Sequence, residues 1–162
     1  MATEVSICNK ALTSVGANTI ISLDDNTTEA ILCKAQYSDV RNAVLEEHNW
    51  TFATKWIDIP KLANPPLGEY RNAFPLPPEV IRVIFVGEDF DHPEQWQLEQ
   101  DMIRKDGDTC KCQVLIRETN PNRYSPLFLE ALSARLAMEF SLPLTNSATF
   151  YDRLANIYEE KM

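Results

Sequence analysis

Apolar positions recur every three or four residues near the N-terminus, as on one face of a helix. Residues 3–15 therefore predict a helix, with Thr3 as its N-cap and Gly16 at its end. The apolar face of this helix consists of Val5, Cys8, Leu12 and Val15. On such a face Cys8 is expected to be a small buried side chain and not a ligand.

The same spacing predicts a second helix that begins after Asn26 and runs to about Glu47. Asn26 can cap this helix, and Glu29 can complete a capping box. Its apolar face consists of Ala30, Cys33, Tyr37, Val40 and Val44. We expect this face to pack on the first helix as an αα-hairpin, which makes Cys33 a core residue as well.

The pattern then changes, because residues 50–57 are aromatic and β-branched and predict a strand. Six of the ten prolines fall in residues 60–78, which predicts an extended loop lying against the body or a neighbouring subunit. Residues 80–86 are apolar on both faces except Arg82, so we expect a strand inside a sheet, ended by Gly87.

Shorter strand signals follow at residues 96–98 and 102–103. Asp106-Gly107 predicts a hairpin turn that leads into a strand over residues 112–116. The middle of the chain is therefore expected to form a small, mostly antiparallel sheet.

The C-terminal part returns to helix, with Ser125 as N-cap and Pro126 at the first helical position. We expect Pro143 to break this helix and Asn146 or Ser147 to begin the last one. The buried faces of the two helices are Leu129, Leu132, Leu136 and Phe140, and then Phe150, Leu154 and Ile157.

These elements predict an α+β fold, mainly α, in a single domain over residues 1–162. Two N-terminal and two C-terminal helices, in residues 1–49 and 125–162, would form a four-helix core. Residues 50–124 would be a small β-rich insertion in that core.

Composition adds limits on function. The chain has 15 basic and 24 acidic residues and a net charge of −9, which opposes tight binding of nucleic acid. No apolar run approaches the roughly 20 residues of a membrane span, and the N-terminus lacks the order of a secretion signal. We expect a protein kept in the cytosol, with its four cysteines reduced.

Acidic residues are concentrated in one stretch, residues 88–101, which contains no Lys or Arg. The acids are Glu88, Asp89, Asp91, Glu94, Glu99 and Asp101. From the residues alone this stretch is either an ordinary solvated loop or a functional acidic surface.

No motif for catalysis or for a cofactor is visible. Cys110 and Cys112 are one residue apart, closer than the two to four intervening residues usual between zinc thiolates. His48 and His92 belong to no nucleophilic motif readable from the sequence, although either could meet a partner in space, and the four glycines are not clustered as in a phosphate loop. We predict no catalytic, metal or cofactor site, and hence a protein that is not an enzyme.

Three segments, taken in order, resemble the head-to-tail adaptor (connector) family of tailed bacteriophages, which includes tail tubular protein A of short-tailed phages. The segments are EEHNWTFATKW, YRNAFPLPPEVIRVIFV and YSPLFLEALSARLAMEFSLPLTNS. The resemblance implies a structural virion protein that forms a twelve-fold ring between the portal protein and the tail tube or nozzle protein. It also implies assembly in the host cytoplasm and a place at the head–tail junction.

Within such a ring the DNA channel would continue towards the tail, and acids would let DNA pass without tight binding. We assign candidate lumen or rim acids to Glu88, Asp89, Asp91 and Glu94. Candidate contacts between subunits are Tyr70 and Phe74. Candidate contacts to portal or tail are Tyr158, Glu159, Glu160, Lys161 and Met162.

Two alternatives stay open: a tail terminator or tail completion protein, and a cell-wall hydrolase. One departure from the family concerns the end of the chain. Several adaptors carry a C-terminal extension that reaches into the portal, whereas this sequence stops at Met162 in its last predicted helix.

Overall fold

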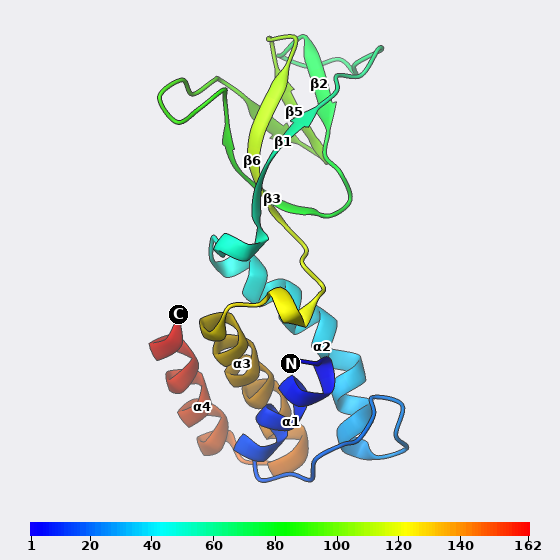
Figure 1. The fold of residues 1–162 in the computed structure, drawn as a ribbon, viewed down its shortest axis with the longest axis vertical. Coiled ribbons are helices and arrows are strands. Elements are labelled where there is room, and N and C mark those ends of the chain that lie inside the picture. The colour runs from blue at the N-terminus through cyan, green and yellow to red at the C-terminus, as the bar shows by residue number, and fades with distance from the viewer. The chain divides into compact units, whose positions relative to one another are not determined.

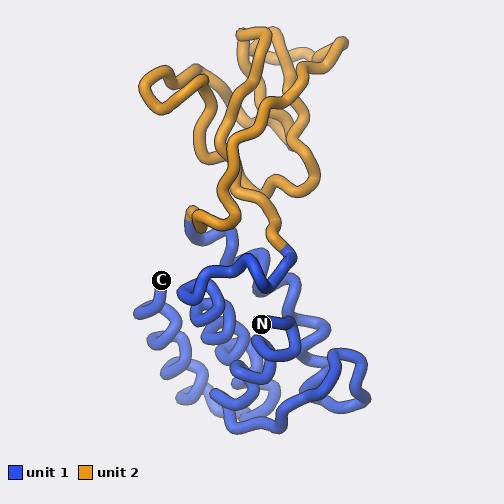
Figure 2. The backbone as a smooth tube through the Cα atoms, viewed as in Figure 1, with its two compact units in different colours: residues 1–48, 119–162 blue, residues 49–118 orange.

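The computed structural model describes residues 1–162 and contains four α-helices and two three-stranded sheets. Helix accounts for 44% of the chain and strand for 20%. The chain divides into two compact units (Figure 1, Figure 2). Unit 1 is Met1–His48 with Thr119–Met162, and unit 2 is Asn49–Glu118.

Unit 1 is helical, and its two halves come from the two ends of the chain. Its helices are α1 (Glu4–Ser14), α2 (Thr28–Glu47), α3 (Pro126–Thr145) and α4 (Ala148–Lys161). A 3₁₀ turn, Pro121–Arg123, precedes α3.

The caps of unit 1 follow local rules. The Thr3 hydroxyl accepts a hydrogen bond from the Ser6 amide at 3.0 Å, and Gly16 ends α1 with φ of 74°, which confirms that helix. Thr27 and not Asn26 caps α2, since its hydroxyl accepts from the Ala30 amide at 3.2 Å.

Helix α3 is the centre of unit 1 (Figure 1). It buries side chains on more than one face, among them Phe128, Leu132, Leu136 and Phe140. Because α1 and α2 both pack mainly on α3, the expected αα-hairpin of these two helices is a minor contact. The predicted face of α2 is confirmed, since all five of its residues are buried.

Pro143 does not break α3, contrary to the prediction. It lies in the last turn, where the missing amide removes one hydrogen bond without interrupting the rest of the helix. The helix ends at Asn146, which adopts the left-handed conformation with φ of 54°. Ser125 and Ser147 cap α3 and α4 as predicted.

Unit 2 contains two antiparallel sheets, in the orders β1-β6-β3 and β2-β5-β4. A 3₁₀ turn, Thr51–Ala53, precedes the first strand. The strands are β1 (Thr54–Ile59), β2 (Asn72–Pro75), β3 (Val80–Val86), β4 (Gln97–Glu99), β5 (Met102–Lys105) and β6 (Cys110–Ile116).

Unit 2 has a hydrophobic core of its own, so the predicted four-helix core with a small β insertion is wrong. Both sheets contribute to this core, which consists of Ile59, Phe74, Val86, Ile103, Cys110, Cys112 and Val114. Side chains alternate between the two faces of β6, so Cys110, Cys112 and Val114 all point into this core. The fold is mixed α+β, with two compact units in place of one helical core.

Three details of the predicted sheet are also wrong. Strand β3 is at an edge and β6 is central, while β2 lies inside the proline-rich stretch expected to be only loop. Asp106-Gly107 connects β5 of one sheet to β6 of the other and forms no hairpin. Away from the core, Phe85 of β3 packs against the rings of Trp56 and Phe90, so an apolar residue there does not require a central strand.

Candidate functional site

Strand β5 carries two buried cations side by side in the sequence, Arg104 and Lys105. Each side chain is only 1% exposed. Successive residues of a strand point to opposite faces, so the two cations serve different surroundings. A charge buried to this extent requires partners, and those partners come from the two long loops of unit 2.

Arg104 holds the proline-rich loop. One of its terminal nitrogens, Nη2, donates to the carbonyl oxygens of Pro66 at 2.9 Å and of Tyr70 at 2.7 Å. Its Nε lies 3.8 Å from a carboxylate oxygen of Glu99. A Cβ on Gly68 would lie 2.7 Å from the same Nη2, so a side chain at residue 68 would require the guanidinium to shift.

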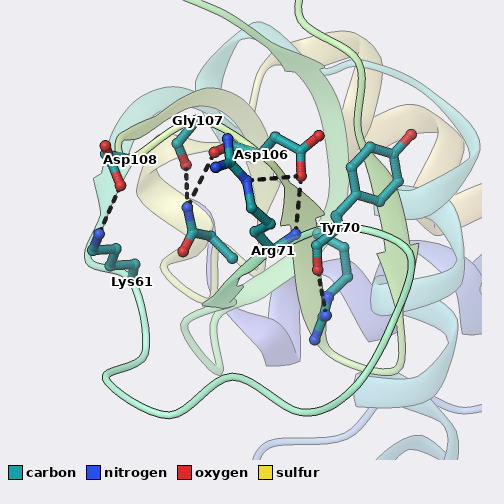
Figure 3. Close-up of polar contacts among 8 residues, drawn as sticks. Lys61, Tyr70, Arg71, Asp106, Gly107 and Asp108 are labelled. Carbon is teal, nitrogen blue, oxygen red and sulfur yellow. Dashed lines mark hydrogen bonds and ion pairs between the residues drawn. The ribbon is translucent and has the colours of Figure 1, made fainter.

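The turn after β5 fixes both ends of this loop (Figure 3). Asp106 accepts a hydrogen bond from the backbone amide of Arg71 at 2.9 Å, and the side-chain Nδ2 of Asn72 donates to the carbonyl of Gly107 at 3.0 Å. Lys61 donates to Asp108 at 2.7 Å, a hydrogen bond that lowers the pKa of that carboxyl.

Leu67 occupies the tip of the loop, where its side chain is 98% exposed. The backbone on either side of it is hydrogen-bonded to Arg104 through Pro66 and Tyr70. The loop therefore presents an apolar side chain to solvent on a fixed backbone.

Lys105 holds the acidic stretch from the other face of β5. Its ammonium donates to the carbonyl of Thr109, forms an ion pair with Glu94 and lies 5.9 Å from the centre of the Phe74 ring. The acidic stretch is thus attached to the core of unit 2 and is not a free loop.

A tight turn orders the first part of the acidic stretch. Asp89 accepts hydrogen bonds from the Asp91 amide at 3.0 Å, the His92 amide at 3.1 Å and His92 Nδ1 at 2.8 Å. The His92 ring lowers the pKa of Asp89. At the base of the turn Gly87 has φ of 151°, and a Cβ there would lie 2.3 Å from the carbonyl of His92.

This turn places Phe90 over the β1-β6-β3 sheet. The Phe90 ring centre lies 5.5 Å from that of Trp56 and 5.0 Å from that of Phe85, and the last two are 5.9 Å apart. Trp56 remains 38% exposed and Phe90 62% exposed. We call these three rings the aromatic face; its rings pack on one another, and two of them stay largely accessible to solvent.

The candidate lumen acids have different surroundings. Glu88 lies 3.6 Å from Lys111, Asp89 is bound to His92, and Glu94 is paired with buried Lys105. Asp91 is exposed on the turn.

Of the candidate contacts between subunits, Phe74 is completely buried in the core of unit 2. Its side chain is therefore a packing residue and does not reach the surface. Tyr70 is half-buried, and its carbonyl binds Arg104.

The candidate portal contacts lie at the end of α4. Tyr158 is buried and donates from its hydroxyl to Glu47 at 2.6 Å; burial and this carboxylate raise the pKa of the phenol. Lys161 binds Glu130 at 2.8 Å. Glu159, Glu160 and Met162 are exposed.

The four cysteines are free and buried. Cys110 and Cys112 lie on the same inward face of β6, and the hydrogen bond that the Cys110 thiol donates to Cys112, together with burial, raises the pKa of Cys110. The structure contains no cluster of three or more His, Cys, Asp or Glu side chains that could hold a metal ion. No helix combines the length and apolar character needed to cross a membrane.

Sequence reasoning missed the two buried cations, the loop tip and the aromatic face. One signal was available for the cations, since Arg104-Lys105 follows Met102-Ile103 directly within a strand pattern. The partners were not visible, because the carbonyls of residues 66 and 70 have no signature in the sequence.

Searches of the chain against models of protein families and against curated protein sequences find no match.

Proposed function

We propose that this chain is a structural subunit of the ring that joins the head of a tailed bacteriophage to its tail. Its partners would be further copies of itself, the portal protein and the tail tube or nozzle protein. The observation that carries the proposal is the ordered set of three segments that resemble the adaptor family.

These segments sample both units. The first covers the end of α2 and the start of β1, the second covers β2 and β3, and the third runs from the start of α3 to the cap of α4. The resemblance therefore draws on both units and is not confined to one helix or one strand.

The charges of unit 2 favour passage of DNA over binding of DNA. Six of its basic side chains lie within 4 Å of a carboxylate: Lys55, Lys61, Arg71, Arg104, Lys105 and Lys111. Cations that are already paired have less to gain from phosphates, while exposed acids such as Asp91 repel them.

The first test is electron microscopy of the purified protein, alone and mixed with portal rings of the same virus. We expect rings of this protein stacked coaxially on the portal, with a mass by native mass spectrometry that is a whole multiple of the subunit. Binding to the tail tube without binding to the portal would instead identify a tail terminator or completion protein. Clearing of a peptidoglycan suspension would identify a hydrolase and contradict the proposal.

The lumen assignment is tested on virions that carry Asp91→Lys. Asp91 is the informative acid because Glu94 also holds buried Lys105 and its reversal would disturb the fold. We expect slower genome ejection, whereas Asp39→Lys on the exposed side of α2 serves as the matched control. Ejection at the normal rate with Asp91→Lys would contradict a position in the channel.

A further inference from the structure

Unit 1 has a groove on α3, between α1 and α4. The two outer helices both pack on α3 and hardly touch each other. The small side chains of Ala134 and Ala137 form part of the floor, and Phe150, Leu154 and Ile157 of α4 form one wall. The groove has a volume of about 440 Å³, well above the roughly 150 Å³ in which a benzene ring can bind. It therefore offers an apolar seat that can accept a side chain from another molecule.

The rim of this groove is basic, although the chain as a whole is acidic. It carries Lys10 of α1 with Arg153 and Lys161 of α4, and its one carboxylate is that of Glu130. Lys161 binds Glu130 at 2.8 Å. Lys10 and Arg153 are exposed, and neither forms an ion pair. Two unpaired cations beside an apolar seat favour an occupant that combines an apolar side chain with carboxylates.

The chain itself contains such a segment, the Ile21 loop, which we define as residues 17–27 between α1 and α2. Ile21 is 92% exposed, whereas its neighbour Ile20 is buried. Asn9 of α1 exchanges two hydrogen bonds of 2.8 Å with the backbone of Ile20. Asp25 accepts hydrogen bonds from the amides of Ile21 and Ser22 at 2.9 and 3.0 Å. Ile21 is thus presented on a fixed backbone, which loses little conformational entropy on docking.

The surroundings of Ile21 are acidic. Residues 17–33 contain three acids, Asp24, Asp25 and Glu29, and no Lys or Arg. Asp24 is paired with Lys34 of α2 at 2.6 Å, whereas Asp25 and Glu29 form no ion pair. Because Asp25 is bound to the amide of Ile21 itself, an apolar side chain and an unpaired negative charge lie together. The loop and the groove therefore carry opposite charges that are not already neutralised by neighbours.

The loop and the groove also lie on opposite sides of unit 1. In Figure 1 the loop between α1 and α2 extends on the side of the unit away from α4, and the groove is on the side of α4. In a ring of many copies, each subunit meets its two neighbours through different surfaces that are nearly opposite each other. The placement of these two surfaces suits such a ring.

We propose that the Ile21 loop of one copy docks in the groove between α1 and α4 of a second copy. Ile21 fills the apolar seat, and the carboxylate of Asp25 approaches Lys10 and Arg153. The contact is head-to-tail, so every dimer leaves one loop and one groove free, and further copies add until the ring closes. This inference rests on the proposed ring function and gives that ring a contact between its helical units.

The direct test is disulfide trapping in the full-length protein, both free and in rings assembled on the portal. Ile21→Cys and Ile157→Cys are made as separate variants and mixed; the natural cysteines are buried and contribute little background. We expect a mixed disulfide between them, and a ladder of linked copies from the double variant. Leu67→Cys, at a residue 98% exposed in unit 2, replaces Ile21→Cys in the control. Trapping of Ile21→Cys no faster than the control in either state would overturn the inference.

A charge exchange provides a second measurement without added cysteines. Ile21→Lys should weaken self-association by about tenfold or more in sedimentation equilibrium, since it places a cation beside Lys10 and Arg153. Leu67→Lys, the control at similar exposure, should leave self-association unchanged. Arg153→Glu should weaken it as well, whereas the double variant Ile21→Lys/Arg153→Glu should recover part of the loss, because opposite charges meet again. A double variant no stronger than either single variant would overturn the inference.

The outcomes separate this inference from the proposed function. Portal-bound rings in which Ile21→Cys and Ile157→Cys do not link would contradict the docking contact and leave the proposed function standing. Loss of portal binding with Arg153→Glu but not with Ile21→Lys would show that the portal fills the groove, which also overturns the inference. Linked copies that ignore the portal would support the docking contact and contradict the proposed function.

Discussion

The two units achieve stability by different means. Unit 1 packs four helices around α3 and buries mainly apolar side chains, with ion pairs and hydrogen bonds at its margins. Unit 2 is about 70 residues long, and its core is supplemented by two buried cations that hold its loops. The comparison shows why the loops of unit 2 are ordered: they supply the partners that the cations need.

The largest expected effect comes from removing one aromatic ring from each core. Phe74→Ala in unit 2 and Phe140→Ala in unit 1 should each lower the free energy of unfolding by about 3–5 kcal/mol, because both rings are completely buried. Hydrogen exchange measured by mass spectrometry should show the loss of protection mainly in the unit that carries the substitution. Equal loss in both units after either change would show that the two units unfold together.

Arg104→Met tests whether the buried cation Arg104 anchors the proline-rich loop. The methionine fills part of the space but leaves the carbonyls of Pro66 and Tyr70 without their donor, at a cost of about 2–3 kcal/mol. We expect faster hydrogen exchange and new proteolytic cleavage in residues 60–71. Leu98→Met, at an exposed residue of the same sheet, is the control. A loop that stays protected in Arg104→Met would refute the anchoring role.

A smaller effect is expected at the margin of unit 1. Tyr158→Phe removes the hydroxyl that donates to Glu47. Because the partly exposed Glu47 carboxylate can bind water instead, the free energy of unfolding should fall by only about 1 kcal/mol. Local hydrogen exchange in α4 should rise while unit 2 is unaffected. Tyr151→Phe, on the same helix, should change little; an equal effect from both would show that the Glu47 hydrogen bond is unimportant.

The smallest expected effect is a loss of folding stability at low pH. Hydrogen bonds from His92, Lys61 and Lys161 lower the pKa of Asp89, Asp108 and Glu130 respectively. A carboxyl whose pKa is lowered by folding contributes stability above its unfolded pKa and loses it as pH falls through the lowered value. Both units should therefore lose a little stability below about pH 4.

The measurement is an NMR titration of the three carboxyl groups. Each should titrate below its usual range in the native protein, and Lys61→Met should return the pKa of Asp108 towards the usual value. Ordinary pKa values in the unaltered protein would show that these exposed pairs are not formed in solution.

Local rules predicted unit 1 well and unit 2 less well, for a physical reason. The caps at Thr3, Ser125 and Ser147 depend on residues within three or four positions, so the sequence displays them directly. The order of the strands depends on pairing between distant segments, and strand β3 looked central although it is an edge.

In the candidate site, too, features set by neighbouring residues were predictable and features set by distant contacts were not. The acidic stretch was recognisable from composition, but its attachment to Lys105 was not. Phe74 was a candidate contact because it is an aromatic residue of the long proline-rich stretch, whereas the register of β2 with β5 places it in the core opposite Ile103.

The insertion of unit 2 within unit 1 also sets an order of synthesis. When α1 and α2 leave the ribosome, the helix that covers their apolar faces is still separated from them by the whole of unit 2. At the usual rate of translation, about 5–20 residues per second, roughly 5–20 s pass between the synthesis of the end of α2 and that of the end of α3. Unit 2 is complete in sequence before unit 1, so the β sheets have the first opportunity to fold, while the apolar faces of α1 and α2 lack the helix that covers them.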